Sequence, residues 1–406
     1  MTSLKTAGSR LTAALLFITA ALHGADSNSM PATTYTPAKD TLVYVGTYTG
    51  AKSKGIYRFK LQTENEADPA NIPLRPFGLA AETPNPTFLA IDPARHLLFA
   101  ANEIDTFEGK PSGAISSFAI DPATGKLTLI NQRPSSGGGP CHLLLDATGR
   151  NILVANYGGG SVSVIRVAPD GRLGETTAFI QNHGKSLDPA RQEGPHAHCV
   201  TLDAANRFVF VCDLGLDRVL IYRFDADHGT LTPAEPAYAA IKPGSGPRHL
   251  AFRPDGRFAY VFNELNSTIT TFAYAPATGR LTEVATISSL PPGYTGKNSG
   301  AEIAVHPGGK FLYASNRGRN SIALLAIDPD KGTLGFVADY DTGGKIPRHF
   351  AFDPSATHLV IGNQNSDTIL VTRIAADGRL QPSAIHTAVP SPVCAVFLPP
   401  TPDRAR

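Results

Sequence analysis

Short apolar runs, each bounded by Gly, Pro, Asp or Asn, follow one another along most of the chain. Within a run such as Phe258-Ala259-Tyr260-Val261-Phe262 the pattern has a period of two, which is typical of β-strands, and the 3.6-residue period of amphipathic helices is missing. Asp-Gly pairs at Asp170-Gly171, Asp255-Gly256 and Asp377-Gly378 provide the chemistry of tight turns. The pattern predicts an all-β chain of short antiparallel strands.

One unit recurs along this chain: an apolar strand, a turn, a second strand that ends in a polar residue, and a polar turn. The second strands end at Thr47, Asn102, Asn156, Asp213, Asn263, Asn316 and Asn363. These positions lie 47 to 57 residues apart, which is the length of a four-stranded propeller blade. We therefore predict a seven-bladed β-propeller with four antiparallel strands per blade.

The first unit lacks an innermost strand of its own. It begins with a run of second-strand type, Leu42 to Thr47, which is followed by a third strand, Gly55 to Leu61. An unpartnered run of innermost type, Val393 to Leu398, stands at the other end of the chain. Because an unclosed ring would leave two bare sheet edges, we predict that this C-terminal strand joins the first blade.

The N-terminal residues have the pattern of a secretory signal peptide. Lys5 and Arg10 precede an apolar run, Leu11 to Leu22, and small residues follow it. We expect a signal peptide over residues 1–24, a flexible leader over 25–40, the propeller over 41–399 and a tail over 400–406, in a secreted or periplasmic protein. An uncleaved anchor is the alternative.

Composition and charge narrow the class of partner. Apolar residues make up 42% of the chain, which argues against a disordered protein despite 38 Gly and 33 Pro. The net charge is +2, and cleavage after residue 24 would remove Lys5 and Arg10 and leave it at zero. A nucleic-acid partner is therefore not expected, since it requires a basic surface. We expect no membrane partner after signal cleavage, and a monomer.

Cysteine spacing and motifs argue against several kinds of site. Cys141, Cys199, Cys212 and Cys394 form no CxxC pair, so buried free thiols are expected, with a disulfide as the alternative in an exported protein. The chain has no Gly-x-Ser-x-Gly, HExxH, EF-hand or P-loop motif. His196 and His198 could ligate a metal, but no closely spaced carboxylate completes a metal-binding motif with them. We therefore expect no metal and no cofactor.

Polar residues gather where the propeller would bring distant segments together. The starts of the innermost strands and the ends of the second strands meet at one mouth of a propeller channel. The first group comprises Cys141, His142, His196, His198, Arg248, His249, Glu302, Arg348 and His349, and the second includes Asn102, Glu103, Asn156, Tyr157, Asn263, Glu264, Asn316, Arg317, Asn363 and Gln364. Most of the Asn residues are interpreted as turn caps. The His and Arg residues favour a site for an anionic ligand.

Several motifs in these segments resemble one family. They are Leu42-Val-Tyr-Val-Gly-Thr-Tyr-Thr49, Val154-Ala-Asn-Tyr-Gly-Gly-Gly-Ser161, Pro195-His-Ala-His198, Gly246-Pro-Arg-His249, Phe262-Asn-Glu264 and Ser315-Asn-Arg-Gly318. They resemble the lactonase family of seven-bladed propellers over about residues 41 to 398. That family includes bacterial 6-phosphogluconolactonases and fungal carboxymuconate cyclases.

The resemblance implies a catalytic cluster of one His, two Arg and one Glu. In this chain the His is His196 or His198, and the others are Arg248, Glu264 and Arg317. In lactone hydrolysis the His would act as the base, Glu264 would orient it or activate water, and the two Arg would stabilise the oxyanion or bind a substrate anion.

Seven further residues are predicted to bind substrate: His142, His249, Glu302, Arg348, His349, Asn102 and Glu103. We expect a 6-phosphogluconolactonase-like hydrolase of a small anionic sugar-acid lactone or related carboxylate. The alternatives are a carboxymuconate-type cyclase and a non-catalytic binding propeller.

Overall fold

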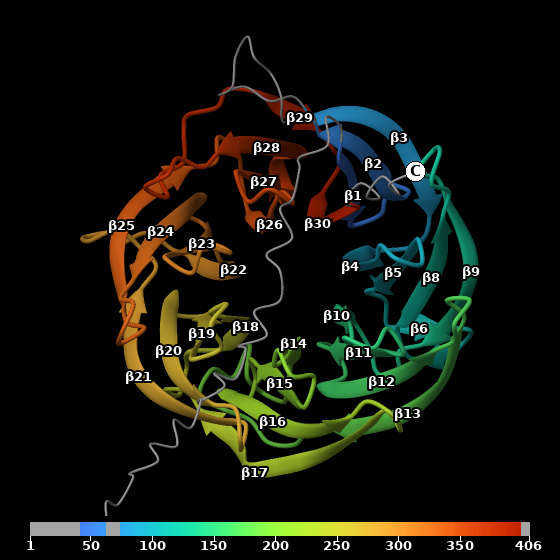
Figure 1. Cartoon of the computed structure of the whole chain (residues 1–406), viewed down its shortest axis with the longest axis horizontal. Coiled ribbons are helices and arrows are strands. Elements are labelled where there is room, and N and C mark those ends of the chain that lie inside the picture. Colours follow the sequence, from blue (N-terminus) through green and yellow to red (C-terminus); the bar gives the residue numbers. More distant parts are fainter. Residues whose placement is uncertain (1–40, 62–73, 399–406) are drawn as a thin grey trace, which may run out of the picture. The chain divides into compact units, whose positions relative to one another are not determined.

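The computed structural model describes residues 41–61 and 74–398, and seven four-stranded antiparallel sheets make up this part of the chain. The sheets stand around a common axis like the blades of a propeller (Figure 1). The all-β, seven-bladed fold predicted from the repeats is therefore confirmed. The predicted signal peptide, leader and tail lie outside the described residues and remain predictions.

The first four blades are formed by strands between residues 41 and 240, together with the C-terminal strand. From the axis outward, blade one contains β30 (Pro392–Leu398), β1 (Thr41–Thr47), β2 (Gly55–Leu61) and β3 (Leu74–Glu82). In the same order, blade two contains β4 (Pro86–Asp92), β5 (Leu97–Asn102), β8 (Ala114–Ile120) and β9 (Leu127–Pro134). Blade three contains β10 (Pro140–Leu145), β11 (Asn151–Asn156), β12 (Ser161–Val167) and β13 (Leu173–Gln181). Blade four contains β14 (Ala197–Leu202), β15 (Phe208–Asp213), β16 (Arg218–Asp225) and β17 (Thr230–Ala240).

The remaining three blades follow the same plan. Blade five contains β18 (Pro247–Phe252), β19 (Phe258–Asn263), β20 (Thr268–Ala275) and β21 (Arg280–Ser288). Blade six contains β22 (Ser299–Val305), β23 (Phe311–Arg317), β24 (Ser321–Ile327) and β25 (Leu334–Asp341). Blade seven contains β26 (Pro347–Phe352), β27 (His358–Asn363), β28 (Thr368–Arg373) and β29 (His386–Ala388). A small hairpin, β6 (Thr106–Phe107) and β7 (Lys110–Pro111), and a 3-10 turn, η1 (Gln364–Ser366), complete the elements.

The C-terminal strand closes the ring as predicted. Strand β30 pairs antiparallel with β1, with Leu398 opposite Leu42 and Val396 opposite Tyr44. The second strands end at the residues predicted from the repeats in six blades, and β23 runs one residue further, to Arg317, which pairs with Ser299. The innermost strands β4, β10, β14, β18, β22, β26 and β30 face the axis (Figure 1).

The hydrophobic core lies between the blades. Every residue of β5, β11, β15, β19 and β27 is buried, because each of these second strands is covered by a blade on both faces. Three buried tyrosines satisfy their hydroxyls across a blade interface. Tyr44, Tyr260 and Tyr313 each donate a hydrogen bond to a glycine carbonyl in a turn of the next blade. Each of these hydrogen bonds links one blade to the next.

All four cysteines are buried and free, as predicted. Within the described residues, no helix is both long and apolar enough to cross a lipid bilayer.

Candidate active site

A β-bulge near the start of the innermost strands creates two layers of side chains along the axis. In β18 the pairing passes from Pro247 to His249, so Arg248 has no partner in the ladder. The same shift occurs in β4, β10, β14 and β26. Bulges redirect side chains, and in these strands the skipped residues are Thr87, Cys141, His198, Arg248 and Arg348. The residues that follow them form the deeper layer.

Three of these bulge residues take part in a small polar cavity of about 200 Å³. Its nine lining residues come from the innermost strands, from the ends of the second strands and from one connector between blades. They are Tyr48, Glu103, Cys141, Tyr157, Arg191, His198, Glu264, Arg317 and Arg348. Of the residues predicted from sequence, His198, Glu264, Arg317, Glu103 and Arg348 therefore meet in one place.

Glu264 is the centre of the charged network. Its carboxylate lies 2.7 Å from Arg191 Nη2, 3.1 Å from Arg248 Nε and 2.7 Å from Arg317 Nη2. Burial by itself would raise the pKa of Glu264, but these three guanidiniums outweigh it and lower the pKa to about 2. Glu264 is therefore a carboxylate at all moderate pH values, and in the described part of the chain it bonds to neither His196 nor His198.

Arg248 and Arg317 are buried cations that keep unused donors. Their side chains are 3% and 11% exposed, so both are largely shielded from bulk water. Burial, followed by the charges of Arg317 and Arg348, lowers the pKa of Arg248 to about 10, which leaves it charged at neutral pH. Arg317 Nη2 also donates to Gly300 O at 2.7 Å. Arg248 Nη1 and Arg317 Nε have no hydrogen-bond partner among the described residues. Arg248 lies behind the cavity and does not line it.

Arg348 lies on the other side of the same cavity, beside Tyr48 and Glu103. Its guanidinium lies over the Tyr48 ring, 5.4 Å from the centroid, and no carboxylate of the described chain pairs with it. The Tyr48 hydroxyl donates to Glu103 at 3.0 Å. Three guanidiniums, those of Arg191, Arg317 and Arg348, thus line the cavity together with the carboxylates of Glu103 and Glu264, and the guanidinium of Arg248 lies behind it.

The two candidate histidines have different surroundings. His198 is buried and lines the cavity, with Nδ1 3.7 Å from Cys141 Sγ. Burial, reinforced by Arg248 and His249, lowers the pKa of His198 well below 6.5, so it is neutral at pH 7. His196 stacks on Tyr157 with ring centroids 4.6 Å apart, and its nitrogens contact Tyr157 O and Glu193. His196 does not line the cavity.

Four predicted substrate-binding residues lie in the deeper layer instead of the cavity wall. They are His142, His249, Glu302 and His349. His249 Nδ1 is 3.0 Å from Glu302 Oε1, and His349 Nε2 is 3.6 Å from Glu302 Oε2. The rings of His142 and His249 meet edge to face at 5.3 Å. His142, His249 and His349 each follow a bulge residue, whereas Glu302 lies within the irregular part of β22, between Gly300 and Ile303.

Asn102 also departs from the prediction. It is fully buried, its Nδ2 donates to Thr83 Oγ1 and Pro84 O, and its Oδ1 accepts from Ser116. Because Asn102 is fully buried, its amide cannot contact a ligand in the cavity. Asn102 therefore braces the end of its strand, as the other strand-end Asn residues were expected to do.

Four cavity residues were absent from the predicted set: Tyr48, Cys141, Tyr157 and Arg191. Tyr48 and Tyr157 directly follow the ends of second strands, the repeat position that also provides Glu103, Glu264 and Arg317. Cys141 occupies the bulge position. The repeat places Cys141 and Tyr157 at the channel mouth without assigning them a role, and Tyr48 occupies the same repeat position as Tyr157. Arg191 lies in a connector between blades and has no repeat signal.

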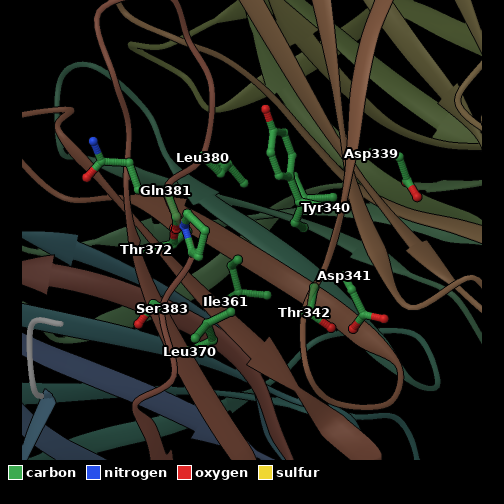
Figure 2. A pocket seen from close by; sticks show the side chains of 12 residues that line it. Asp339, Tyr340, Asp341, Thr342, Ile361, Leu370, Thr372, Leu380, Gln381 and Ser383 are labelled. Carbon is green, nitrogen blue, oxygen red and sulfur yellow. The ribbon is translucent and has the colours of Figure 1, made fainter. Parts of the chain in front are cut away.

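A different cavity, of about 320 Å³, lies between blades six and seven. Figure 2 shows Ile361 and Leu370 between Gln381 on one side and Tyr340 on the other. It is present because β29 has only three residues and leaves part of β28 uncovered. Its lining contains no His or Arg, and it includes none of the predicted site residues. Among the described residues, no three His, Cys, Asp or Glu side chains are placed to hold a metal ion.

Comparison with known proteins assigns the chain to a family. A family model described as "Lactonase, 7-bladed beta-propeller" matches residues 42–397. The chain belongs to this lactonase family. Membership places it among the lactone hydrolases, and the resemblance inferred from the motifs is confirmed.

Relatives of this lactonase include two 6-phosphogluconolactonases and a solved gluconolactonase. The 6-phosphogluconolactonase of Bacillus subtilis is 35% identical over 356 residues, which cover 87% of this chain and 97% of that protein. The 6-phosphogluconolactonase of Formosa agariphila is 32% identical, with 84% and 94% covered. The periplasmic gluconolactonase of Pseudomonas aeruginosa has a solved structure that superposes with a TM-score of 0.80 at 33% identity, covering 88% of this chain and 99% of that one.

Proposed function

We propose that the protein hydrolyses a small sugar-acid lactone by attack of water, with His198 as the base. The reaction would take place in the polar cavity of about 200 Å³, which is called the mouth cavity below. The observation that carries this proposal is the lining itself: one neutral imidazole, three guanidiniums, two carboxylates, two tyrosines and a thiol, with no aliphatic side chain. A polyhydroxylated ring can satisfy such a wall, whereas a lactone with an alkyl tail would bury apolar surface against charges. At roughly 30 Å³ per water, the 200 Å³ cavity has room for one small ring.

His198 is the group best suited to accept the proton of the attacking water. Its low pKa keeps it unprotonated at neutral pH, and Cys141 and His249 fix its ring from two sides. A weak base still helps when water is held beside an ester carbonyl, because the proton leaves as the C–O bond forms. The proton then passes to the ring oxygen as the acyl–oxygen bond breaks, which yields the open hydroxy acid.

Arg317 and Arg348 are placed to stabilise the oxyanion of the tetrahedral intermediate. Both line the cavity, and Arg348 has no carboxylate partner in the described chain. Fixed cations in a site with little water stabilise developing negative charge more strongly than solvent does. The same charges would hold the carboxylate of the product.

Glu264 fits a positioning role better than that of a base or a partner for the histidine. With a pKa of about 2 it has little affinity for a proton. Its three ion pairs orient Arg317 directly and hold Arg248 behind the cavity.

We also propose that the protein acts outside the cytoplasm. The N-terminal pattern of residues 1–24 supports export. The periplasmic gluconolactonase of Pseudomonas aeruginosa, at 33% identity, offers a parallel.

The test compares two single variants, His198→Gln inside the cavity and His196→Gln outside it. The purified protein is given δ-gluconolactone, 6-phosphogluconolactone and a carboxymuconate, and proton release and ultraviolet absorbance are followed against the uncatalysed rates. His198→Gln should lower kcat by about 100-fold or more, the usual contribution of a general base. His196→Gln, which alters a ring outside the cavity, should change kcat by less than about fivefold, because a residue that does not touch the reacting atoms adds little to the chemical step.

Three results would contradict the proposal. No acceleration of any lactone by the wild-type protein would remove the proposed hydrolase function. Reaction with the muconate alone would favour the cyclase. Equal turnover of His198→Gln and wild type would exclude His198 as the base.

A further inference from the structure

Arg191 differs from the other cations of the site in its origin. It belongs to residues 182–196, which join β13 to β14 and form the longest connector between blades in the described chain. Arg248, Arg317 and Arg348 occupy repeated positions on strands, whereas Arg191 is carried to the cavity by a segment with no counterpart in the other blades.

The backbone beside Arg191 is firmly anchored. Gln192 is fully buried, and its amide donates to Leu214 O and accepts from Asp188 N. Ser186 donates to Asp217 at 2.6 Å, and Asn182 donates to Asp213 at 2.7 Å. The connector is therefore a built part of the site, and the partly exposed side chain of Arg191 can change partners while its backbone stays fixed.

Of the three ion pairs of Glu264, the pair with Arg191 is the one that can break without leaving a buried charge uncompensated. Glu264 keeps two buried guanidinium partners, Arg248 and Arg317, when Arg191 is removed. Neither buried cation can leave without creating an uncompensated charge. The Arg191 side chain is 41% exposed, so water can solvate it during an exchange. Both of its contacts, to Glu264 and to the Tyr157 hydroxyl, use Nη2. A planar guanidinium has further donors that suit a phosphate or carboxylate.

We propose that Arg191 is a specificity-determining residue that binds an anionic group carried by the substrate away from the lactone carbonyl, and that it exchanges Glu264 for this group on binding. The inference rests on the proposed lactonase function of the same cavity. The two arginines then have different roles. Arg348 faces the reacting carbonyl, and Arg191, which is partly exposed, binds the distal anion, a phosphate or a carboxylate.

The experiment uses three lactones that differ at the distal end. They are δ-gluconolactone, which is neutral there, 6-phosphogluconolactone, which carries a phosphate, and glucarolactone, which carries a carboxylate. Arg191→Ala should raise KM for the two anionic lactones by about tenfold or more, with KM for the neutral one and all kcat values within about threefold, because a lost bidentate contact to an anion weakens binding. Arg191→Lys should recover part of the loss. Arg150→Ala is the matched control, since Arg150 is also about half exposed and paired with an acid, Asp227, outside the cavity.

Binding of the products provides a readout independent of turnover. Calorimetric titration with 6-phosphogluconate, glucarate and gluconate should show weaker binding to Arg191→Ala for the first two only. Loss with 6-phosphogluconate alone supports the inference with phosphate as the recognised group. Equal losses for all three ligands, or none, would overturn it while leaving the hydrolase function intact. A wild-type protein that opens none of the lactones would instead overturn both.

Discussion

Four buried histidines around the axis make the stability of this protein sensitive to mild acid. His142, His198 and His249 are at most 9% exposed as residues, and the His349 side chain is 11% exposed. Burial is the main cause that lowers the pKa of each, well below 6.5 for three of them and to about 4 for His349. In the unfolded chain all four titrate near pH 6.5. Acid therefore adds protons to the unfolded state first.

The sign and size of the effect follow from this difference. Because the folded pKa values are lowered, the stabilising contribution is present above pH 6.5 and is lost as the pH falls toward the folded values. Between pH 7.5 and 5.5 the free energy of unfolding should fall by a little over 1 kcal/mol for each imidazole, or about 5 kcal/mol for four. That is a third or more of the stability of an ordinary domain, about 5–15 kcal/mol. Carboxyl groups with ordinary pKa values near 4 titrate below this window.

Urea unfolding at several pH values measures this loss. The chain has no Trp, so far-ultraviolet circular dichroism is the suitable signal. His349→Gln, which can still accept the hydrogen bond from Ala395 N, should reduce the loss to about 4 kcal/mol, since one of four imidazoles is removed. His183→Gln, at an exposed position, should leave it unchanged. Stability that does not vary between pH 7.5 and 5.5, or an equal change in both variants, would refute the reasoning.

Two further substitutions test the network and the ring. Glu264→Gln leaves Arg248 and Arg317 without a buried counter-charge. Lactone turnover should therefore fall by more than about tenfold, and the free energy of unfolding should fall by about 3–5 kcal/mol. Glu82→Gln, which removes an exposed ion pair with Lys54, should change neither quantity. Wild-type turnover by Glu264→Gln would count against the positioning role. Gly46→Ala places a methyl group against the Pro86 carbonyl between blades one and two and should lower stability by about 1–3 kcal/mol, while Gly50→Ala meets no atom within 4 Å. A melting temperature equal to that of Gly50→Ala would contradict this account of blade packing.

The propeller was predictable because six of the seven blades fold from a continuous stretch of sequence, and the first blade takes only its innermost strand from elsewhere. The polar residue that ends every second strand and the Asp-Gly turns mark the repeat locally, and ring closure by Val393–Leu398 follows from one missing strand. Whether a residue faces the cavity depends on the bulge, which has no local signature. Arg248 and His249 are adjacent, yet one contacts Glu264 and the other Glu302.

The presence of Tyr48, Tyr157 and Arg191 in the cavity could be recognised only from the three-dimensional structure. Tyr48 and Tyr157 share a repeat position with Glu264, but their residue types alone do not indicate catalysis. Arg191 reaches the cavity from a connector, and its position depends on buried Gln192 and on the acids of blade four. No periodic pattern records such a contact.

The structure of the protein with gluconate bound tests the central claim most directly. We expect the carboxylate of this product in the mouth cavity, within hydrogen-bond distance of Arg317 and Arg348, with the His198 ring beside the carboxyl carbon. Gluconate bound between blades six and seven, or at the opposite end of the axis with the mouth cavity empty, would contradict the account.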